Sequence, residues 1–260
     1  MPVALTIAGS DSSGGAGLQA DLLTFATFGV DGASVVTAVT AQNTTGVRAI
    51  EPVAPDVVAA QLDAVLDDLD VRAAKTGMLH RAAVVEVVAA RLRARPVPAL
   101  VVDPVSVSTS GALLLEPAAL DVLRRSLLPL ATLVTPNLHE AEALTGRPVP
   151  DVAAMHEAAH ALVGLGARAA LVTGGHLPGD AVDVLYDGTT VRELPAARIA
   201  TRHTHGTGCA LSAAITACLA RGDALVAAVE TAKRHVAQAL ATAPGLGRGA
   251  GPIDHLRGRR

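Results

Sequence analysis

Lysine is nearly absent from this sequence. Lys75 and Lys233 are its only two lysines, although lysine and arginine together number 21. Neither lysine belongs to a G-x-x-x-x-G-K-[ST] motif, so the sequence excludes a P-loop, in which a lysine contacts nucleotide phosphates. Any phosphate chemistry must therefore depend on backbone amides, arginine, hydroxyl groups or a metal ion.

Aromatic residues are equally scarce, since the chain has no tryptophan, one tyrosine and two phenylalanines. Phe25 and Phe28 are three positions apart on a predicted helix, a spacing that favours a place in the core over a platform for stacking bases. A heterocyclic ligand would therefore pack against aliphatic side chains, Met78 and polar groups.

The chain has only two cysteines, Cys209 and Cys218. Both fall on one predicted helix, where their backbones would be roughly 13 Å apart, too far for a disulfide. Their number and spacing also exclude a structural zinc site built from cysteines. Cys218 is expected to be a small buried residue, which leaves Cys209 as the candidate for chemistry.

Three further features are missing: a basic surface, a membrane-length apolar run and a secretory signal. The net charge of −3 argues against a nucleic-acid partner. Glycine, proline or charged residues interrupt the apolar runs before they could span a bilayer. The first ten residues contain no basic segment. We expect a cytoplasmic protein with neither a nucleic-acid nor a membrane partner.

What the chain does contain is enough apolar surface for one large core, because 50% of its 260 residues are hydrophobic. Short apolar runs alternate with amphipathic stretches, which predicts an α/β fold whose parallel sheet is covered by helices on both faces. The expected strands are residues 3–8, 33–40, 71–75, 99–103, 130–135 and 169–173, with a hairpin at 182–186 and 191–194. The expected helices are residues 18–28, 55–69, 82–93, 117–127, 138–144, 152–165, 207–220 and 224–241. We expect a single domain over residues 1–260, with a loosely held tail at residues 245–260.

Polar or glycine-rich segments follow most of these strands. In doubly wound sheets, ligands bind beyond the carboxyl ends of the strands, so these segments are expected to meet at one rim. They are Gly9–Gly17, Gln42-Asn43, Gly77-Met78, Asp103, Asn137–Glu140, Gly174-Gly175 and Thr204–Cys209.

The segment Gly206-Thr207-Gly208-Cys209 opens an alanine-rich helix. Free backbone N–H groups and the positive end of the dipole at such a helix start favour an anion, and the glycines let it approach closely. A thiol held there would have a lowered pKa. The alternatives are a tight loop-to-helix junction without a ligand and a purely structural Cys209.

Four polar side chains near the predicted rim have both functional and structural interpretations. Asp21 either complements a helix N-terminus or accepts hydrogen bonds from a substrate. Asp103 ends a buried strand and must be half-exposed or paired. Asn137 and Glu140 have the spacing of a capping box, and oxygen ligands at that place also suit Mg²⁺.

Gly15-Ala16-Gly17-Leu18-Gln19-Ala20 matches the G-x-G-x-x-A pattern of dinucleotide-binding proteins. The match is poor in context, because Gly15 lies well past the first strand and the second strand ends without an acid for the ribose. A dinucleotide-dependent oxidoreductase is therefore the weakest alternative.

Taken together, seven motifs resemble the hydroxymethylpyrimidine/phosphomethylpyrimidine kinases of thiamine biosynthesis. They are Leu5–Leu22, Thr40–Thr44, Lys75–Leu79, Val102–Val105, Thr135–Ala141, Gly174–His176 and Thr204–Cys209, in register from about Val3 to Pro252. The resemblance implies a ribokinase-like three-layer α/β/α fold, ATP and Mg²⁺ as cofactors, and a homodimer. It also implies phosphorylation of the pyrimidine's primary alcohol and a second phosphorylation of the monophosphate.

The resemblance implies a role for each matching residue. Asp21 and Gln42 would hydrogen-bond the aminopyrimidine, in a pocket shaped by Gly9, Ala16 and Met78. Asn137, Thr173, Gly175 and His205 would serve the nucleotide, and Asp103 and Glu140 the metal. Gly206, Thr207, Gly208 and Cys209 would act in transfer, with Cys209 as base or charge-stabilising thiolate.

Two cations typical of this family are replaced. Thr173 stands where a lysine usually precedes Gly-Gly-His, and Ser106 and Thr109 stand where methionine and lysine are usual. These changes cast doubt on nucleotide affinity and on the second phosphorylation. A pyridoxal or pyridoxine kinase of the same fold and a catalytically weakened pyrimidine-binding protein remain as alternatives.

Overall fold

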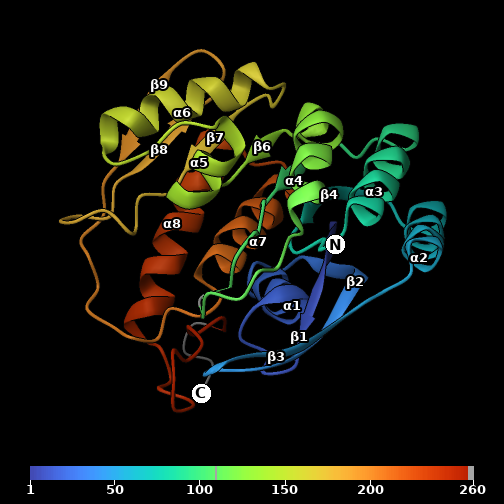
Figure 1. The fold of residues 1–260 in the computed structure, drawn as a ribbon, viewed down its shortest axis with the longest axis horizontal. Helices are drawn as coiled ribbons and strands as arrows, with labels where there is room; N and C mark the ends of the chain where they lie inside the picture. The colour runs from blue at the N-terminus through green and yellow to red at the C-terminus, as the bar shows by residue number, and fades with distance from the viewer. Residues whose placement is uncertain (109, 257–260) are drawn as a thin grey trace.

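A mostly parallel sheet forms the centre of the structure, a computed structural model that describes residues 1–108 and 110–256 (Figure 1). Nine strands of that part of the chain run in the order β3-β2-β1-β4-β5-β6-β7-β8-β9. Neighbours from β2 to β7 are parallel, while β3, β8 and β9 join antiparallel at the edges. The strands are β1 Val3–Asp11, β2 Asp31–Asn43, β3 Gly46–Pro52, β4 Val71–Thr76, β5 Leu100–Val102, β6 Leu133–Val134, β7 Ala170–Val172, β8 Asp183–Tyr186 and β9 Val191–Leu194.

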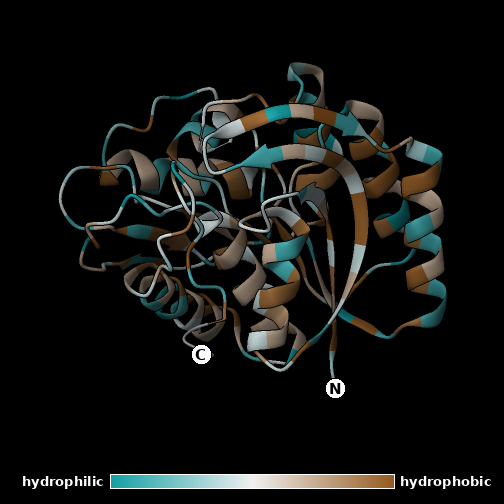
Figure 2. Ribbon diagram, turned by 90° about the horizontal axis from the view of Figure 1, so that it is seen from below, coloured by the Kyte–Doolittle hydropathy of each residue, from teal (hydrophilic) through white to brown (hydrophobic). Residues whose placement is uncertain are grey.

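Helices cover both faces of the sheet, which confirms the predicted three layers. One face carries α2 (Pro55–Asp68), α3 (Ala82–Ala94), α4 (Pro117–Val122), α5 (Leu138–Thr145) and α6 (Val152–Gly164). The other face carries α1 (Gly17–Thr27), α7 (Thr207–Ala220) and α8 (Leu225–Ala241). Figure 2 shows hydrophobic and hydrophilic residues on different sides of the surface helices, as amphipathic packing requires.

Helix α7 packs against the sheet and contacts both other helices of its face, α1 and α8. Side chains alternate across β1, so Leu5 and Ile7 join one core while Ala4 joins the other. On that second face Ala4 and Ala73 of the sheet meet Ala213 of α7, all fully buried. Small residues on both sides let the helix approach the sheet closely, which fixes where its N-terminus lies.

The predicted helices and strands differ from the structure in two places. Strand β3 was not predicted, although Gly46–Pro52 pairs with β2 at the edge of the sheet. The single helix predicted at residues 117–127 is α4 followed by a π-helical turn at Leu123–Leu127 and a 3₁₀ turn at Leu128–Leu130. Pro129 within the last turn cannot continue an α-helix.

The expectation of a loosely held tail is wrong for Gly251–Leu256. Ile253 is 2% exposed and joins the α7–α8 core, and His255 is 5% exposed. The backbone of His205 pairs with this segment, accepting from Ile253 N and donating to the carbonyl of Gly251. The glycine- and arginine-rich composition suggested a mobile tail, but the buried Ile253 and the backbone pairing with His205 hold this segment in place.

Among the described residues, none of the helices combines the length and the apolar character that crossing a bilayer requires.

Candidate active site

A cavity of about 980 Å³ lies at the carboxyl ends of the parallel strands. The cavity is lined by every residue that the sequence analysis proposed as a site residue. These are Gly9, Ala16, Asp21, Gln42, Met78, Asp103, Asn137, Glu140, Thr173, Gly175, His205, Gly206, Thr207, Gly208 and Cys209. The sheet topology thus brings together residues that are up to 200 positions apart in the chain.

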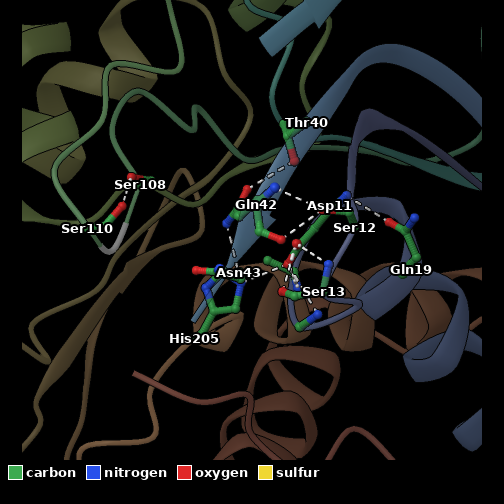
Figure 3. A network of polar contacts seen from close by, with 12 residues as sticks. Asp11, Ser12, Ser13, Gln19, Thr40, Gln42, Asn43, Ser108, Ser110 and His205 are labelled. Atoms are coloured by element: carbon green, nitrogen blue, oxygen red, sulfur yellow. Dashed lines mark hydrogen bonds and ion pairs between the residues drawn. The ribbon is translucent and has the colours of Figure 1, made fainter. Parts of the chain in front are cut away.

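Asp11 organises the glycine-rich loop at one end of the cavity (Figure 3). Its carboxylate accepts hydrogen bonds from the backbone amides of Ser13, Gly15 and Ala16, and Nε2 of His205 lies 2.7 Å from Oδ2. Burial raises the pKa of Asp11, but the hydrogen bonds from His205 and Ser13 outweigh it and lower the pKa below its ordinary value. A charged Asp11 therefore ties the loop before α1 to the loop before α7.

Gln42 and Met78 border the same end of the cavity. Gln42 accepts a hydrogen bond from Thr40 Oγ1 at 3.2 Å, and its Nε2 lies 3.4 Å from Nε2 of His205. Met78 is 7% exposed, and a Cβ added at Gly9 would lie 3.1 Å from its sulfur. Glycine at position 9 is what lets Met78 close this wall.

The start of α7 opens into the cavity without a side-chain cap. Its N-cap is Gly206, in the left-handed region at φ +83°, and no side chain accepts a hydrogen bond from the helix start. A Cβ at Gly206 would lie 1.9 Å from the carbonyl oxygen of Gly15, so only glycine fits. The first amides of a helix have no intrahelical acceptor, which makes Gly206–Cys209 a site suited to an anion.

The prediction of a lowered thiol pKa at Cys209 is wrong. Cys209 is half-buried on the first turn of α7. Burial raises the pKa of its thiol to about 12, with Asp21 and Asp103 adding to the rise and Lys75 opposing it. The helix start favours a thiolate, but the enclosed position beside two carboxylates outweighs that effect. Cys209 is therefore a neutral thiol in the described structure.

Lys75 forms a buried ion pair that the sequence analysis missed. Its Nζ lies 2.7 Å from Oδ1 of Asp21 and 3.9 Å from Oδ2 of Asp103. Burial disfavours the ammonium, but the neighbouring acids, led by Asp21, raise the pKa of Lys75 above its ordinary value. A lysine in a buried strand needs such a partner, and this was the signal available in the sequence.

This pairing changes the interpretation of Asp21. Its side chain is fully buried, and its second oxygen accepts a hydrogen bond from Thr6 Oγ1 at 2.6 Å. The carboxylate that was expected to accept hydrogen bonds from a substrate is enclosed at the wall of the cavity. In the structure, Asp21 therefore neutralises Lys75 and accepts a hydrogen bond from Thr6.

Asp103 and Glu140 face the cavity as two buried carboxyl groups. Asp103 accepts a hydrogen bond from Ser212 at 2.8 Å, and burial raises its pKa against the influence of Lys75. Glu140 completes the predicted capping box with Asn137, and it also accepts from the backbone amide of Ser106 at 3.2 Å. Burial, and then the charge of Asp103, raise the pKa of Glu140 to about 8.

These two carboxyl groups fit a hydrated divalent cation. Mg²⁺ commonly binds through one or two carboxylates, several waters and substrate phosphates. A cation would favour the charged form of both groups and so oppose the burial that raises their pKa values. Thr135 Oγ1 lies in the same wall, buried and with no hydrogen-bond partner among the described residues. Within residues 1–108 and 110–256, no group of three or more His, Cys, Asp or Glu is placed to hold a metal alone.

The other end of the cavity offers few unpaired cations. Lys233 is paired with Asp183, and Arg198 donates to the carbonyls of Gly175, Leu177 and Gly179. Thr173, where the resemblance led us to expect lysine, is half-buried and pairs with Asn137 through a parallel bridge. Of the other replaced positions, Ser106 contacts Glu140, and Thr109 lies outside the described residues.

Comparison with known proteins gives consistent matches over nearly the whole chain. A family model described as phosphomethylpyrimidine kinase matches residues 11–254. The hydroxymethylpyrimidine/phosphomethylpyrimidine kinase of Rhizobium meliloti is 54% identical over 258 residues, which cover 98% of this chain and 97% of the relative.

Two solved structures share this fold. An ADP complex of Bacillus subtilis pyridoxal kinase has a TM-score of 0.92 and 41% identity, covering 99% of this chain and 98% of its own. A phosphomethylpyrimidine kinase from Clostridium difficile has a TM-score of 0.83 and 41% identity, covering 92% of this chain and 99% of its own. These matches confirm the ribokinase-like fold expected from the motifs.

Proposed function

The chain belongs to the phosphomethylpyrimidine kinase family, and from that premise we propose that it phosphorylates hydroxymethylpyrimidine, and then the resulting monophosphate, with ATP. The observation that carries the proposal is the uncapped start of α7, which opens into the same cavity as Asp103 and Glu140. Amides that receive negative charge thus face carboxyl groups suited to a cation, as phosphoryl transfer requires.

The pyrimidine would occupy the end of the cavity lined by Gly9, Ala16, Gln42 and Met78. The Gln42 amide, held between Thr40 and His205, can present both a donor and an acceptor to a ring edge. Met78 supplies the apolar wall that a chain poor in aromatic residues needs. Asp21 also lies in the wall of the cavity, where its carboxylate neutralises Lys75.

In the transfer step, the alcohol oxygen forms a bond to the γ-phosphorus of ATP while the bond from that phosphorus to ADP breaks and ADP leaves. The alcohol proton passes to an oxygen of the transferred phosphoryl group. The amides of Gly206–Cys209 stabilise the charge on the transferring group. Because the pKa of Cys209 is about 12, we assign its neutral thiol to orienting the alcohol through a hydrogen bond. A loose transition state needs little proton abstraction in advance.

The nucleotide would lie along Asn137, Thr173 and Gly175, with His205 bordering the phosphates. Asp103 and Glu140 would hold Mg²⁺ through oxygen ligands and water. When bound, the ion shields phosphate charge. The chain itself fixes both oxygens of Glu140, since Oε2 accepts from the amide of Asn137 in the capping box and Oε1 accepts from the amide of Ser106.

The experiment combines the purified protein with ATP, Mg²⁺ and hydroxymethylpyrimidine, and resolves the mono- and diphosphate products by chromatography. We expect both products, with the diphosphate appearing after the monophosphate. ATP consumption without either product contradicts the proposal, and monophosphate alone restricts it to the first step.

Pyridoxal phosphorylation is the second candidate, because the Bacillus subtilis pyridoxal kinase is similar over 99% of this chain. Its substrate also carries a hydroxymethyl group on a nitrogen ring. Competition between the two alcohols at equal concentration decides between them. We expect kcat/KM to favour hydroxymethylpyrimidine.

We further propose a cytoplasmic homodimer. A kinase needs a compartment that supplies ATP, and β3 presents an unpaired edge at the end of the sheet beside Val39, which is 51% exposed. Sedimentation of the purified protein and fractionation of the source cells test these two statements separately.

A further inference from the structure

His255, in the tail segment Gly251–Leu256, reaches the junction of the two glycine loops of the site. Its side chain is buried, and Nε2 lies 2.9 Å from the carbonyl oxygen of Gly15. That same oxygen is the atom that a Cβ at Gly206 would strike, and Cε1 of His255 would lie 3.1 Å from this Cβ. One imidazole therefore contacts the glycine loop before α1 and lies against the N-cap of α7.

The chemistry of this contact fixes the state of the ring. A carbonyl oxygen can only accept, so Nε2 of His255 carries the proton and donates it to Gly15. Nδ1 is buried and finds no hydrogen-bond partner within the described residues. Burial lowers the pKa of His255, which favours the neutral ring. The residue thus acts as a neutral donor at a fixed place.

Three contacts hold the imidazole there. Thr27 Oγ1, at the end of α1, donates to the carbonyl of His255 at 3.0 Å. Ile253 packs into the core beside α7 and α8. The backbone of His205 pairs with the tail, and its ring binds Asp11. The tail is therefore tied to both loops and to α1.

We propose that His255 is a positioning residue for phosphoryl transfer. By donating to Gly15 it holds this carbonyl against Gly206, and so sets where the first amides of α7 lie. The inference rests on the proposed function, because it concerns the amides assigned to the transferring group. A displacement near 1 Å at such a site can cost about a hundredfold in rate. The loss should fall on kcat, since His255 is not among the residues that line the cavity.

The test compares His255→Met with His255→Gln in the full-length protein. Methionine fills a similar volume without a donor, whereas the glutamine amide can donate to Gly15. We expect His255→Met to lower kcat about 10- to 100-fold, with the KM for the pyrimidine within about twofold. Glutamine should restore most of kcat. Leu246→Ala, which trims a side chain of the same tail that is 59% exposed, should leave kcat unchanged.

Amide ¹H–¹⁵N spectra of Gly206 and Gly208 provide a readout that does not need activity. We expect both resonances to shift in His255→Met and to return toward wild type in His255→Gln. If His255→Met does not fold, Thr27→Val loosens the same ring and should shift both resonances in the same direction.

Unshifted amides in a folded His255→Met or Thr27→Val protein would overturn the inference. So would equal losses of kcat in the methionine and glutamine variants. If the wild-type protein shows no phosphorylation, the proposed function fails, and the spectra alone then decide whether His255 positions the amides.

Discussion

Nζ of Lys75 lies 2.7 Å from Oδ1 of Asp21, and neither side chain is exposed to solvent. The pair joins strand β4 to helix α1 at the wall of the cavity. With Asp103 at 3.9 Å, it places one positive charge between two acids at the base of the site.

Asp21→Asn should destabilise the fold. The amide keeps an acceptor for Thr6 but leaves the Lys75 ammonium buried with only the more distant Asp103. Removing one partner of a buried pair typically costs about 3 kcal/mol or more of unfolding free energy. Urea denaturation measures the loss. Asp70→Asn is the control, since its pair with Arg72 is exposed and should matter little. Unchanged stability with a raised KM for the pyrimidine would instead support direct substrate binding by Asp21.

Cys209 should resist alkylation at neutral pH. The pKa of its thiol is raised to about 12 and that of Cys218 to about 11, so neither is a thiolate at pH 7. Iodoacetamide labelling followed by mass spectrometry should show slow modification that accelerates only in alkaline solution. Fast labelling of Cys209 at pH 7 would restore the thiolate base that the helix start suggested.

Cys209→Ala should cut kcat far more than it weakens pyrimidine binding, because the thiol is assigned to the reacting alcohol. Steady-state kinetics and calorimetric binding of the pyrimidine measure the two effects. Cys218→Ala is the matched control, since Cys218 lies on the same helix but in the core. Equal turnover in the two variants would remove Cys209 from the transfer step.

The site could be predicted from the sequence because its residues interrupt the regular alternation of apolar strands and amphipathic helices. Gly206, Asp103 and Asn137 each follow an apolar strand or precede a helix, and parallel topology brings such positions to one rim. The capping box of Asn137 and Glu140 is a local pattern that needs no tertiary information.

The missed features depend on contacts between distant segments. Nothing local to Asp21 reveals Lys75, which is 54 positions away. The raised pKa of Cys209 follows from burial by other elements, with the charges of Asp21 and Asp103 adding to it. Strand β3 is half-exposed at an edge, where the sequence shows little apolar periodicity. The tail, rich in glycine and arginine, is ordered through Ile253 and His255, whose partners lie elsewhere in the chain.

Stability should depend on pH through Glu140. Its pKa rises from an ordinary value of 4.5 to about 8 on folding, so between these values the folded state binds more protons than the unfolded state. Glu140 therefore makes the protein less stable as pH rises across this window. Urea denaturation at pH 5, 6.5 and 8 should show this slope in wild type and a smaller one in Glu140→Gln. Parallel slopes would mean that Glu140 is ionised throughout. Mg²⁺ should also reduce the wild-type slope if Asp103 and Glu140 hold it.

Gly206→Ala and Gly208→Ala should act in opposite directions, although the two glycines are only two positions apart. Alanine at 206 needs the left-handed conformation at φ +83° and places Cβ 1.9 Å from the Gly15 carbonyl, so the loop before α1 must move. The strain alone costs about 1–2 kcal/mol. Gly208 has no positive φ and no atom within 4 Å of an added Cβ.

Alanine at 208 removes backbone freedom from the first turn of α7, and should raise the unfolding free energy by about 0.5–1 kcal/mol. Thermal and urea denaturation of both variants check the contrast. Because Gly206 sets where the helix amides lie, its variant should also lose phosphoryl transfer. A stable, fully active Gly206→Ala protein would show that the close approach of Gly15 to α7 is not needed for the reaction.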